Sequence, residues 1–308
     1  MNDMQKRLSV HLPESWNKGI EQANASKNTL FSFAIQTDTH FSELSSAKAC
    51  LNLKALSHFV DLAFFANLGD LTRGYMDVVV NTPEKMRAAM DEAVNRYVED
   101  ANCPVLITMG NHDCNHLWCQ LHGDVSQLIT EKEHFSRVTA RLLAHNGDRM
   151  VTDGERNYSY MDFHDHKIRV VMLNSTDGEF TKGYSERAMI SERQAEWFKT
   201  VALKTDYAVL VMMHIPLFPD FPGNDSSNII NREKILDAVE EFIKNDGNFI
   251  AYMYGHTHNP HHITDQNGRL HISFRGGGHI AEMVRIDTEH RVIDTIPFGD
   301  FPSRTWKY

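Results

Sequence analysis

The chain has 308 residues, 42% of them hydrophobic, which is enough apolar surface for one large globular domain or two modest ones. The formal net charge is −10, from 41 acidic and 31 basic residues, and no run of Lys and Arg is longer than two. This composition argues against a disordered chain and against a protein that holds a nucleic acid backbone through a broad basic surface.

The cysteines and the N-terminus indicate the expected compartment. Four cysteines (Cys50, Cys103, Cys114 and Cys119) form no CxxC pair, so they do not indicate a disulfide framework. Residues 1–16 lack the apolar segment of a signal peptide, and no apolar run approaches the ~18 residues of a membrane-spanning helix. We therefore expect a cytoplasmic protein with no membrane partner.

The chain is expected to consist of one main domain and an N-terminal appendage. Residues 1–29 are predicted to form the appendage, with a short helix and Trp16 as a docking residue. Residues 30–308 are predicted to form a single domain, because no repeat and no long Gly/Ser/Pro linker interrupts them. A helical insertion near residues 117–147 is a candidate cap for a site.

Five short apolar runs each end in a cluster of polar residues. In chain order they are FSFAI before QTDTH, LAFFA before NLGD, PVLITM before GNHD, AVLVMM before HIP, and NFIAYMY before GHTH. Short apolar runs bounded by turn formers are typical of strands that are buried on both faces.

Helices are predicted between these strands. One covers residues 84–98, with Thr82 as its N-cap, and another covers residues 231–244. A third begins at Ser191, where SERQ fits a capping box. Its buried side is predicted to contain Trp197, Phe198 and Val201.

The remaining apolar segments predict a second sheet. RNYSYMDF and KIRVVMLNS have the pattern of paired strands, and HISFRGGGHIAEMVRI and RVIDTIPF the pattern of closing strands of the same sheet. Strands that alternate with helices in this way predict a layered α/β or α+β body with two packed sheets.

The polar residues at the strand ends are ligand types for metals. They are Asp38, His40, Asp70, Asn111, His112, Asp113, His214, His256 and His258. Ligand sites lie outside the carboxyl ends of strands in open sheets, so we expect these side chains to converge. Carboxylate, amide oxygen and imidazole suit manganese, iron, zinc or cobalt. Without His112 and Asp113, the set suffices for two metal ions if one carboxylate bridges them, and such a pair can clamp an in-line phosphoryl displacement.

The ordered pattern DxH, GD, GNHD, H and GHxH, spread over residues 38–258, resembles the calcineurin-like metallophosphoesterase superfamily. The sequences GDLT, GNHD, HIP and GHTH are closest to its bacterial cyclic-nucleotide phosphodiesterase-like group. The resemblance implies an α+β fold, a four-layer α/β/β/α sandwich of two packed mixed sheets flanked by helices. It places the metal site at the strand carboxyl ends.

The resemblance also implies a role for each site residue. One metal ion is held by Asp38, His40 and His258, the other by Asn111, His214 and His256, and Asp70 bridges both. His112 is implied to face the scissile phosphate as a catalytic residue, with Asp113 orienting it. The implied reaction is attack of a metal-bridging hydroxide on phosphorus, without a phosphoenzyme intermediate.

The expected function is therefore a metal-dependent hydrolase of phosphate esters, either a phosphodiesterase or a phosphomonoesterase. Its partner would be a small phosphorylated substrate, with a nucleotide as the first candidate, and two ions of manganese, iron, zinc or cobalt would be its cofactors. Candidate substrate contacts are Arg73, Tyr75 and Asn174. An ordinary ion pair, a core or cap aromatic, and a turn cap are the respective alternatives.

Two other functions stay open on the sequence. One is a metal-binding scaffold on the same fold that binds partners and has lost turnover. The other is a nuclease, which the negative net charge disfavours.

Overall fold

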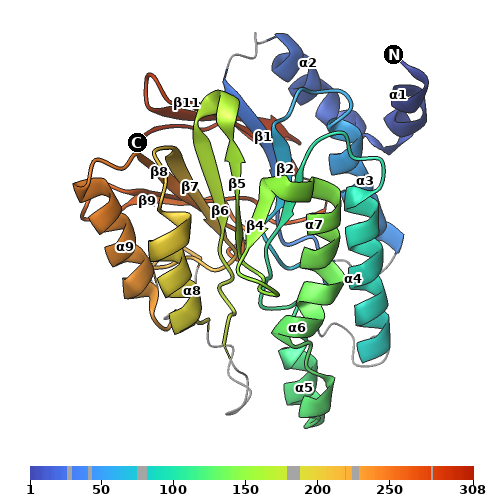
Figure 1. Ribbon diagram of the computed structural model, residues 1–308. Helices are drawn as coiled ribbons and strands as arrows, with labels where there is room; N and C mark the ends of the chain where they lie inside the picture. The colour runs from blue at the N-terminus through green and yellow to red at the C-terminus, as the bar shows by residue number, and fades with distance from the viewer. Residues whose placement is uncertain are drawn as a thin grey trace.

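The fold is a sandwich of two mixed β-sheets with helices on both outer faces, as the computed structural model shows (Figure 1). Helices α3, α4 and α7 lie on one side of the sheets, and helices α8 and α9 lie on the other. This arrangement confirms the four-layer α+β sandwich. The structure describes residues 1–25, 30–40, 44–74, 82–178, 188–218, 220–223, 229–278 and 280–308.

The first sheet has the strand order β13-β12-β11-β1-β2-β3. Its strands are β1 (Phe31–Gln36), β2 (Phe64–Asn67), β3 (Val105–Ile107), β11 (Ala281–Asp287), β12 (Val292–Phe298) and β13 (Thr305–Lys307). The second sheet has the order β4-β5-β6-β7-β8-β10-β9. Its strands are β4 (Met150–Thr152), β5 (Ser159–Phe163), β6 (Ile168–Met172), β7 (Ala208–Met213), β8 (Phe249–Tyr254), β9 (His262–Thr264) and β10 (Leu270–Ser273).

Three of the described helices, α4, α8 and α9, lie where the sequence predicts helices. The described helices are α1 (Asp3–Leu8), α2 (Asn17–Ala25), α3 (Leu44–Leu56), α4 (Pro83–Val98), α5 (His116–His122), α6 (Glu131–His134), α7 (Ala140–Asn146), α8 (Glu192–Trp197) and α9 (Arg232–Lys244). Thr82 caps α4 by accepting a hydrogen bond from Lys85 N. None of the helices in these ranges is long and apolar enough to cross a bilayer.

The five apolar runs form strands that pair in parallel with one another within each sheet. β1, β2 and β3 pair in parallel in the first sheet, and β7 and β8 pair in parallel in the second. All five strands are buried along their whole length. The polar clusters that follow them therefore leave the sheets at the carboxyl ends of parallel strands, as the sequence predicts.

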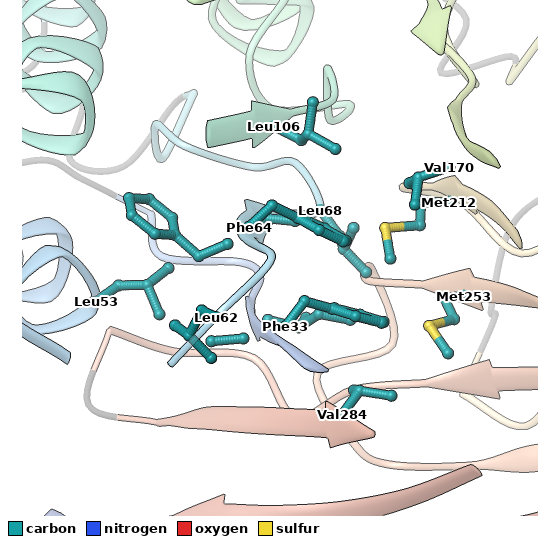
Figure 2. Packing of buried hydrophobic residues seen from close by; sticks show 14 of the residues in the cluster. Phe33, Leu53, Leu62, Phe64, Leu68, Leu106, Val170, Met212, Met253 and Val284 are labelled. Atoms are coloured by element: carbon teal, nitrogen blue, oxygen red, sulfur yellow. The ribbon is translucent and has the colours of Figure 1, made fainter. Parts of the chain in front are cut away.

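Apolar side chains fill the space between the two sheets. Phe33 and Phe64 stack with ring centroids 4.5 Å apart. Figure 2 shows Met212 and Met253 of the second sheet among the residues around these rings. A second cluster of buried residues, which includes Trp197, Phe198 and Val239, packs beneath helices α8 and α9.

The prediction that the last strands close the second sheet was wrong in part. β10 does pair in parallel with β8, but β11 pairs antiparallel with β1 and therefore belongs to the first sheet. The chain crosses between the sheets through Gly276 and Gly277, whose N–H groups donate to His258 O and Thr37 O at 3.2 and 3.0 Å. An apolar pattern predicts a strand but does not identify its partner.

The predicted third helix also differs from expectation in detail. Ser191 caps α8 by accepting a hydrogen bond from Gln194 N at 3.1 Å, but the Gln194 side chain bonds to the backbone of Asn174 instead of completing a capping box. Val201 is 40% exposed, contrary to the prediction. Its helix continues as a π-helical turn over Phe198–Ala202, in which Phe198 and Ala202 are buried and Val201 points to solvent.

The N-terminal segment packs against the first sheet. Trp16 is fully buried, and its ring lies 5.5 Å from the ring of Phe298 in β12. Two side chains of the segment bond to the turn after α3, Gln5 to His58 O and Asn24 to Phe59 O. The boundary near residue 29 stays a prediction.

Part of the predicted insertion extends the helical layer of the first sheet. Asn146, at the end of α7, bonds to both backbone polar groups of Val105 in β3 at 3.0 and 2.7 Å. Arg137 and Arg141 pair with Asp91 of α4 at 2.5 and 3.1 Å. The role of the segment as a cap stays a prediction.

Candidate metal centre

Five of the seven proposed ligands have a left-handed backbone. The φ angles are 52° at Asp38, 45° at His40, 53° at Asp70, 68° at His256 and 55° at His258. A side chain in this region costs ~1–2 kcal/mol, and such strain clusters at functional sites, where the surrounding fold maintains it. The strained turns aim side chains from both sheets at one place.

One group of side chains, termed the inner group, consists of Asp70, Asn111, His214 and His256. Asn111 Oδ1 lies 3.0 Å from both His214 Nε2 and His256 Nδ1. His214 Nε2 lies 3.2 Å from Asp70 Oδ2. Ligand atoms that each bind a transition metal at ~2.1 Å stand ~3 Å from one another. The inner group therefore fits a single metal ion.

A second group, termed the outer group, consists of Asp38, His40, Asp70 and His258, each with one ligand atom within 4.8 Å of the others. His258 Nε2 lies 3.2 Å from His40 Nε2 and 3.3 Å from Asp38 Oδ1. Asp38 Oδ1 is buried and receives no hydrogen bond of good geometry from the residues that the structure describes. A cation would satisfy that oxygen and both imidazole nitrogens. The outer group also fits a metal ion, and Asp70 is common to both groups.

Neighbouring groups fix the orientation of these ligands. Asp38 Oδ2 accepts hydrogen bonds from Thr37 Oγ1 at 2.8 Å and from His256 N at 3.0 Å, which leaves Oδ1 for a metal. Leu68 O lies 2.7 Å from His214 Nδ1, so Nδ1 carries a proton and Nε2 faces the other inner-group ligands. Neither the Thr37–Asp38 bond nor the Leu68–His214 contact is predicted from the sequence. Thr37 could have been suspected from its place before Asp38, whereas no pattern reveals a backbone carbonyl.

Gly110 allows the GNHD turn to pass close to the turn that carries Asp70. A Cβ atom at this position would lie 2.1 Å from both Asp70 N and Asp70 Oδ1. Any other residue would push the two turns apart, so glycine is required here by contact.

His112 faces the centre without belonging to either group. Its Nδ1 lies 2.8 Å from Arg73 O, and its backbone N donates to Asp70 Oδ1 at 2.9 Å. With Nδ1 directed at that carbonyl, Nε2 lies 3.8 Å from Asp70 Oδ2. The His112 side chain is 19% exposed, so Nε2 can meet a molecule that enters from solvent.

Asp113 binds the backbone of two neighbouring turns. It is fully buried, and its two carboxylate oxygens accept hydrogen bonds from the backbone N atoms of Leu71, Thr72 and Gly110 and from Thr72 Oγ1, at 2.9–3.2 Å. These bonds hold the GNHD turn against the GD turn. The Nδ1 atom of the His112 ring lies 2.8 Å from the carbonyl of Arg73, which belongs to the GD turn that Asp113 binds.

The three candidate substrate contacts have different outcomes. Arg73 is exposed next to His112. Tyr75 lies outside the described residues. Asn174 is fully buried, and its Oδ1 accepts hydrogen bonds from Thr176 N and Oγ1 at 2.9 Å each, as in the alternative of a turn cap.

Burial and charge set the protonation of the inner group before metal binds. Burial lowers the pKa of His214, but the Asp70 carboxylate raises it by more, and the pKa stands at about 9. Burial and the charge on His214 lower the pKa of His256 to about 4. Burial raises the pKa of Asp70, yet His214 and His112 outweigh it and hold that pKa well below its usual range. A proton on His214 thus neutralises part of the charge that a metal would neutralise.

The family is identified by a sequence profile described as calcineurin-like phosphoesterase, which matches residues 31–260. The chain belongs to this family, and it is a metal-dependent hydrolase of phosphate esters. The match covers every strand-end residue named above. No protein of curated function matches the sequence at a significant level.

Several solved structures are similar to this chain at low sequence identity. A dimetal phosphatase from Danio rerio is 16% identical, with a TM-score of 0.60 over 91% of this chain and 99% of that one. GAP50, the anchor in the inner membrane complex of Plasmodium, is 14% identical, with a TM-score of 0.47 over 90% of this chain and 88% of that one. A 5'-nucleotidase from Candida albicans is 14% identical, with a TM-score of 0.42 over 83% of this chain and 47% of that one.

Proposed function

We propose that this chain is a two-metal phosphoesterase that hydrolyses a monoester or diester of a small phosphorylated molecule. The observation that carries the proposal is the pair of ligand groups that share Asp70. Inner-group atoms lie 3.0–3.2 Å apart, and outer-group atoms lie within 4.8 Å of one another. One carboxylate common to two such groups favours a bridged pair of ions over two separate sites.

Each protein group has a defined task in this proposal. Asp38, His40 and His258 would hold one ion, Asn111, His214 and His256 the other, with Asp70 between them. The bound ions, as manganese, iron, zinc or cobalt, would supply Lewis acidity and lower the pKa of water toward ~7. The strained turns keep these ligands in place, so little reorganisation accompanies the reaction.

We assign proton donation to His112. Its Nδ1 is directed at Arg73 O, so a proton on Nε2 points toward the centre. From there it would donate a hydrogen bond to a phosphoryl oxygen or a proton to the leaving oxygen. General acid catalysis of this kind contributes ~10²–10⁴-fold in rate. Asp113 would support this position indirectly, by holding the loop.

A small substrate is favoured by charge. The net charge of −10 offers no broad basic surface for a polymer of phosphates. The exposed Arg73 stands beside His112 and could hold one phosphate group through a forked pair of hydrogen bonds. A nucleotide stays the first candidate because of the sequence resemblance to cyclic-nucleotide phosphodiesterases.

His112→Ala tests the proposal. The metal-free protein, reloaded with Mn²⁺, should cleave nitrophenyl phosphate or bis(nitrophenyl) phosphate, and His112→Ala should lower kcat by ~10²–10⁴-fold with metal content unchanged. His290→Ala, on the exposed turn between β11 and β12, is the matched control and should leave kcat unchanged. Wild-type protein that binds two ions but cleaves neither ester would favour the scaffold function instead.

A further inference from the structure

A buried polar cluster lies behind the outer group, between helix α4 and the first sheet. Its members, termed the Tyr97 cluster, are Tyr97, Gln36, Asn67 and Thr39. Tyr97 is fully buried in α4, and the others are 1–5% exposed. The Tyr97 hydroxyl donates to Gln36 Oε1 at 3.1 Å and accepts from Asn67 Nδ2 at 3.0 Å. One hydroxyl thus joins two side chains from two strands.

Gln36 and Asn67 are the last residues of β1 and β2, and they are paired in register. Each therefore stands where its strand turns toward the metal centre. Asp38 follows Gln36 by two residues, and Asp70 follows Asn67 by three. The bond between Gln36 and Asn67 through Tyr97 adds a side-chain link between the starts of both turns. The backbone also joins these turns, since Asp38 N donates to Gly69 O at 3.0 Å and His40 N donates to Asp70 O at 2.9 Å.

The cluster also reaches into the turns themselves. Asn67 Oδ1 accepts a hydrogen bond from Gly69 N at 2.9 Å, immediately before Asp70. Asn67 Nδ2 lies 3.4 Å from Thr39 Oγ1, between Asp38 and His40. Thr39 Oγ1 in turn lies 3.5 Å from Leu71 O, immediately after Asp70. The last two contacts are long, so the Gly69 bond is the main link.

We propose that Tyr97 is a positioning residue for the outer metal ion. All four outer ligands have positive φ angles, and three of them, Asp38, His40 and Asp70, lie in the turns after β1 and β2, where strain is balanced by bonds to the surrounding fold. The Tyr97 hydroxyl holds both turns at the separation that three outer ligands need. The inference rests on the proposed two-metal function.

The alternative is a purely structural role, in which Tyr97 only provides hydrogen bonds for buried amides and stabilises the fold. The two roles differ in what Tyr97→Phe changes. A structural role lowers the melting temperature and leaves metal affinity alone. If Tyr97 has a positioning role, Tyr97→Phe lowers the affinity for one metal ion, because contacts that orient ligands typically account for ~10–100-fold in metal affinity.

The test is a Co²⁺ titration of the metal-free protein, followed by visible absorption and by calorimetry. Tyr97→Phe should lower the affinity for one of the two Co²⁺ ions about 10-fold or more and change the absorption bands of that ion. The weakened ion should be the one that His40→Ala removes. Tyr252→Phe is the matched control, since Tyr252 is equally buried and its hydroxyl has no hydrogen-bond partner in the described residues. It should leave both affinities unchanged.

Unchanged affinity for both ions in Tyr97→Phe, with only a lower melting temperature, would overturn the inference. If Tyr97→Phe does not fold, Gln36→Met removes the acceptor side of the same contact, and it should weaken the same ion. Unchanged affinity there would overturn the inference equally. Wild-type protein that binds no Co²⁺ at all would instead contradict the proposed function.

Discussion

At the scale of single residues, two backbone carbonyls, Leu68 O and Arg73 O, decide which ring nitrogens of His214 and His112 face the metal centre. The strand-end Asp, His and Asn residues predicted from sequence are those that the structure brings together. Residue type and position carried that prediction, because few side chains bind metals. The supports of His214 and His112 are the carbonyls of Leu68 and Arg73, which any residue could provide. The polar side chains of Asp113 and Asn174 bond to turns, and the sequence alone does not reveal those contacts.

The protonation of His214 predicts how metal binding depends on pH. Its pKa of about 9 means that the imidazole is protonated at pH 7 in the metal-free protein. A metal must displace that proton, so the apparent affinity of the inner ion should fall about tenfold for each pH unit below 9. His256, with a pKa of about 4, should contribute only in strong acid.

Calorimetric titration in two buffers of different ionisation enthalpy counts the released protons. At pH 7 we expect about one proton per inner ion. The same group affects the stability of the metal-free protein. Its folded pKa lies above the usual 6.5, so its stabilising effect is full below pH 6.5 and is lost as the pH rises through 9. Metal affinity that is flat between pH 6 and 9 would contradict this assignment of the proton.

At the scale of elements, the strands could be predicted but not all of their partners. The five apolar runs gave β1, β2, β3, β7 and β8, because burial on both faces leaves a continuous apolar signal. β11 joins the first sheet by pairing with β1, and the local sequence of a strand does not identify its partner strand. The left-handed turns after the strands were not predicted from the sequence either, because residues other than glycine seldom adopt that conformation.

The turn at His258 provides a direct test of backbone strain. With φ at 55°, glycine should be more stable than alanine there by ~1 kcal/mol, so metal-free His258→Gly should unfold at higher denaturant than His258→Ala. His262 is the matched control, because it lies in strand β9 and is exposed. There the order should reverse, since glycine weakens a strand. The same order at both positions would argue against strain at His258.

At the scale of the whole molecule, the four-layer sandwich follows from alternating strands and helices, but the placement of the N-terminal segment does not. Trp16 was expected to dock, yet its site beside Phe298 depends on a strand near the other end of the chain. This contact joins distant parts of the sequence on the first sheet. The metal centre, by contrast, is built at the carboxyl ends of strands from both sheets.

Trp16→Ala should separate stability from catalysis. Removal of a fully buried tryptophan costs ~3–5 kcal/mol, so the free energy of unfolding should fall by that amount. Because Trp16 lies on β12, outside both ligand groups, kcat per folded molecule should stay unchanged. Chemical denaturation and kinetics on the same sample measure both quantities. A loss of kcat at unchanged stability would show that the segment acts on the site.

The central claim is that Asp70 joins two metal ions, and anomalous diffraction from Mn²⁺-loaded crystals tests it most directly. We predict two peaks ~3.5–4 Å apart. One should lie among Asp38, His40 and His258, the other among Asn111, His214 and His256, with Asp70 in contact with both. A single peak, or two peaks that do not share Asp70, would contradict the two-metal centre.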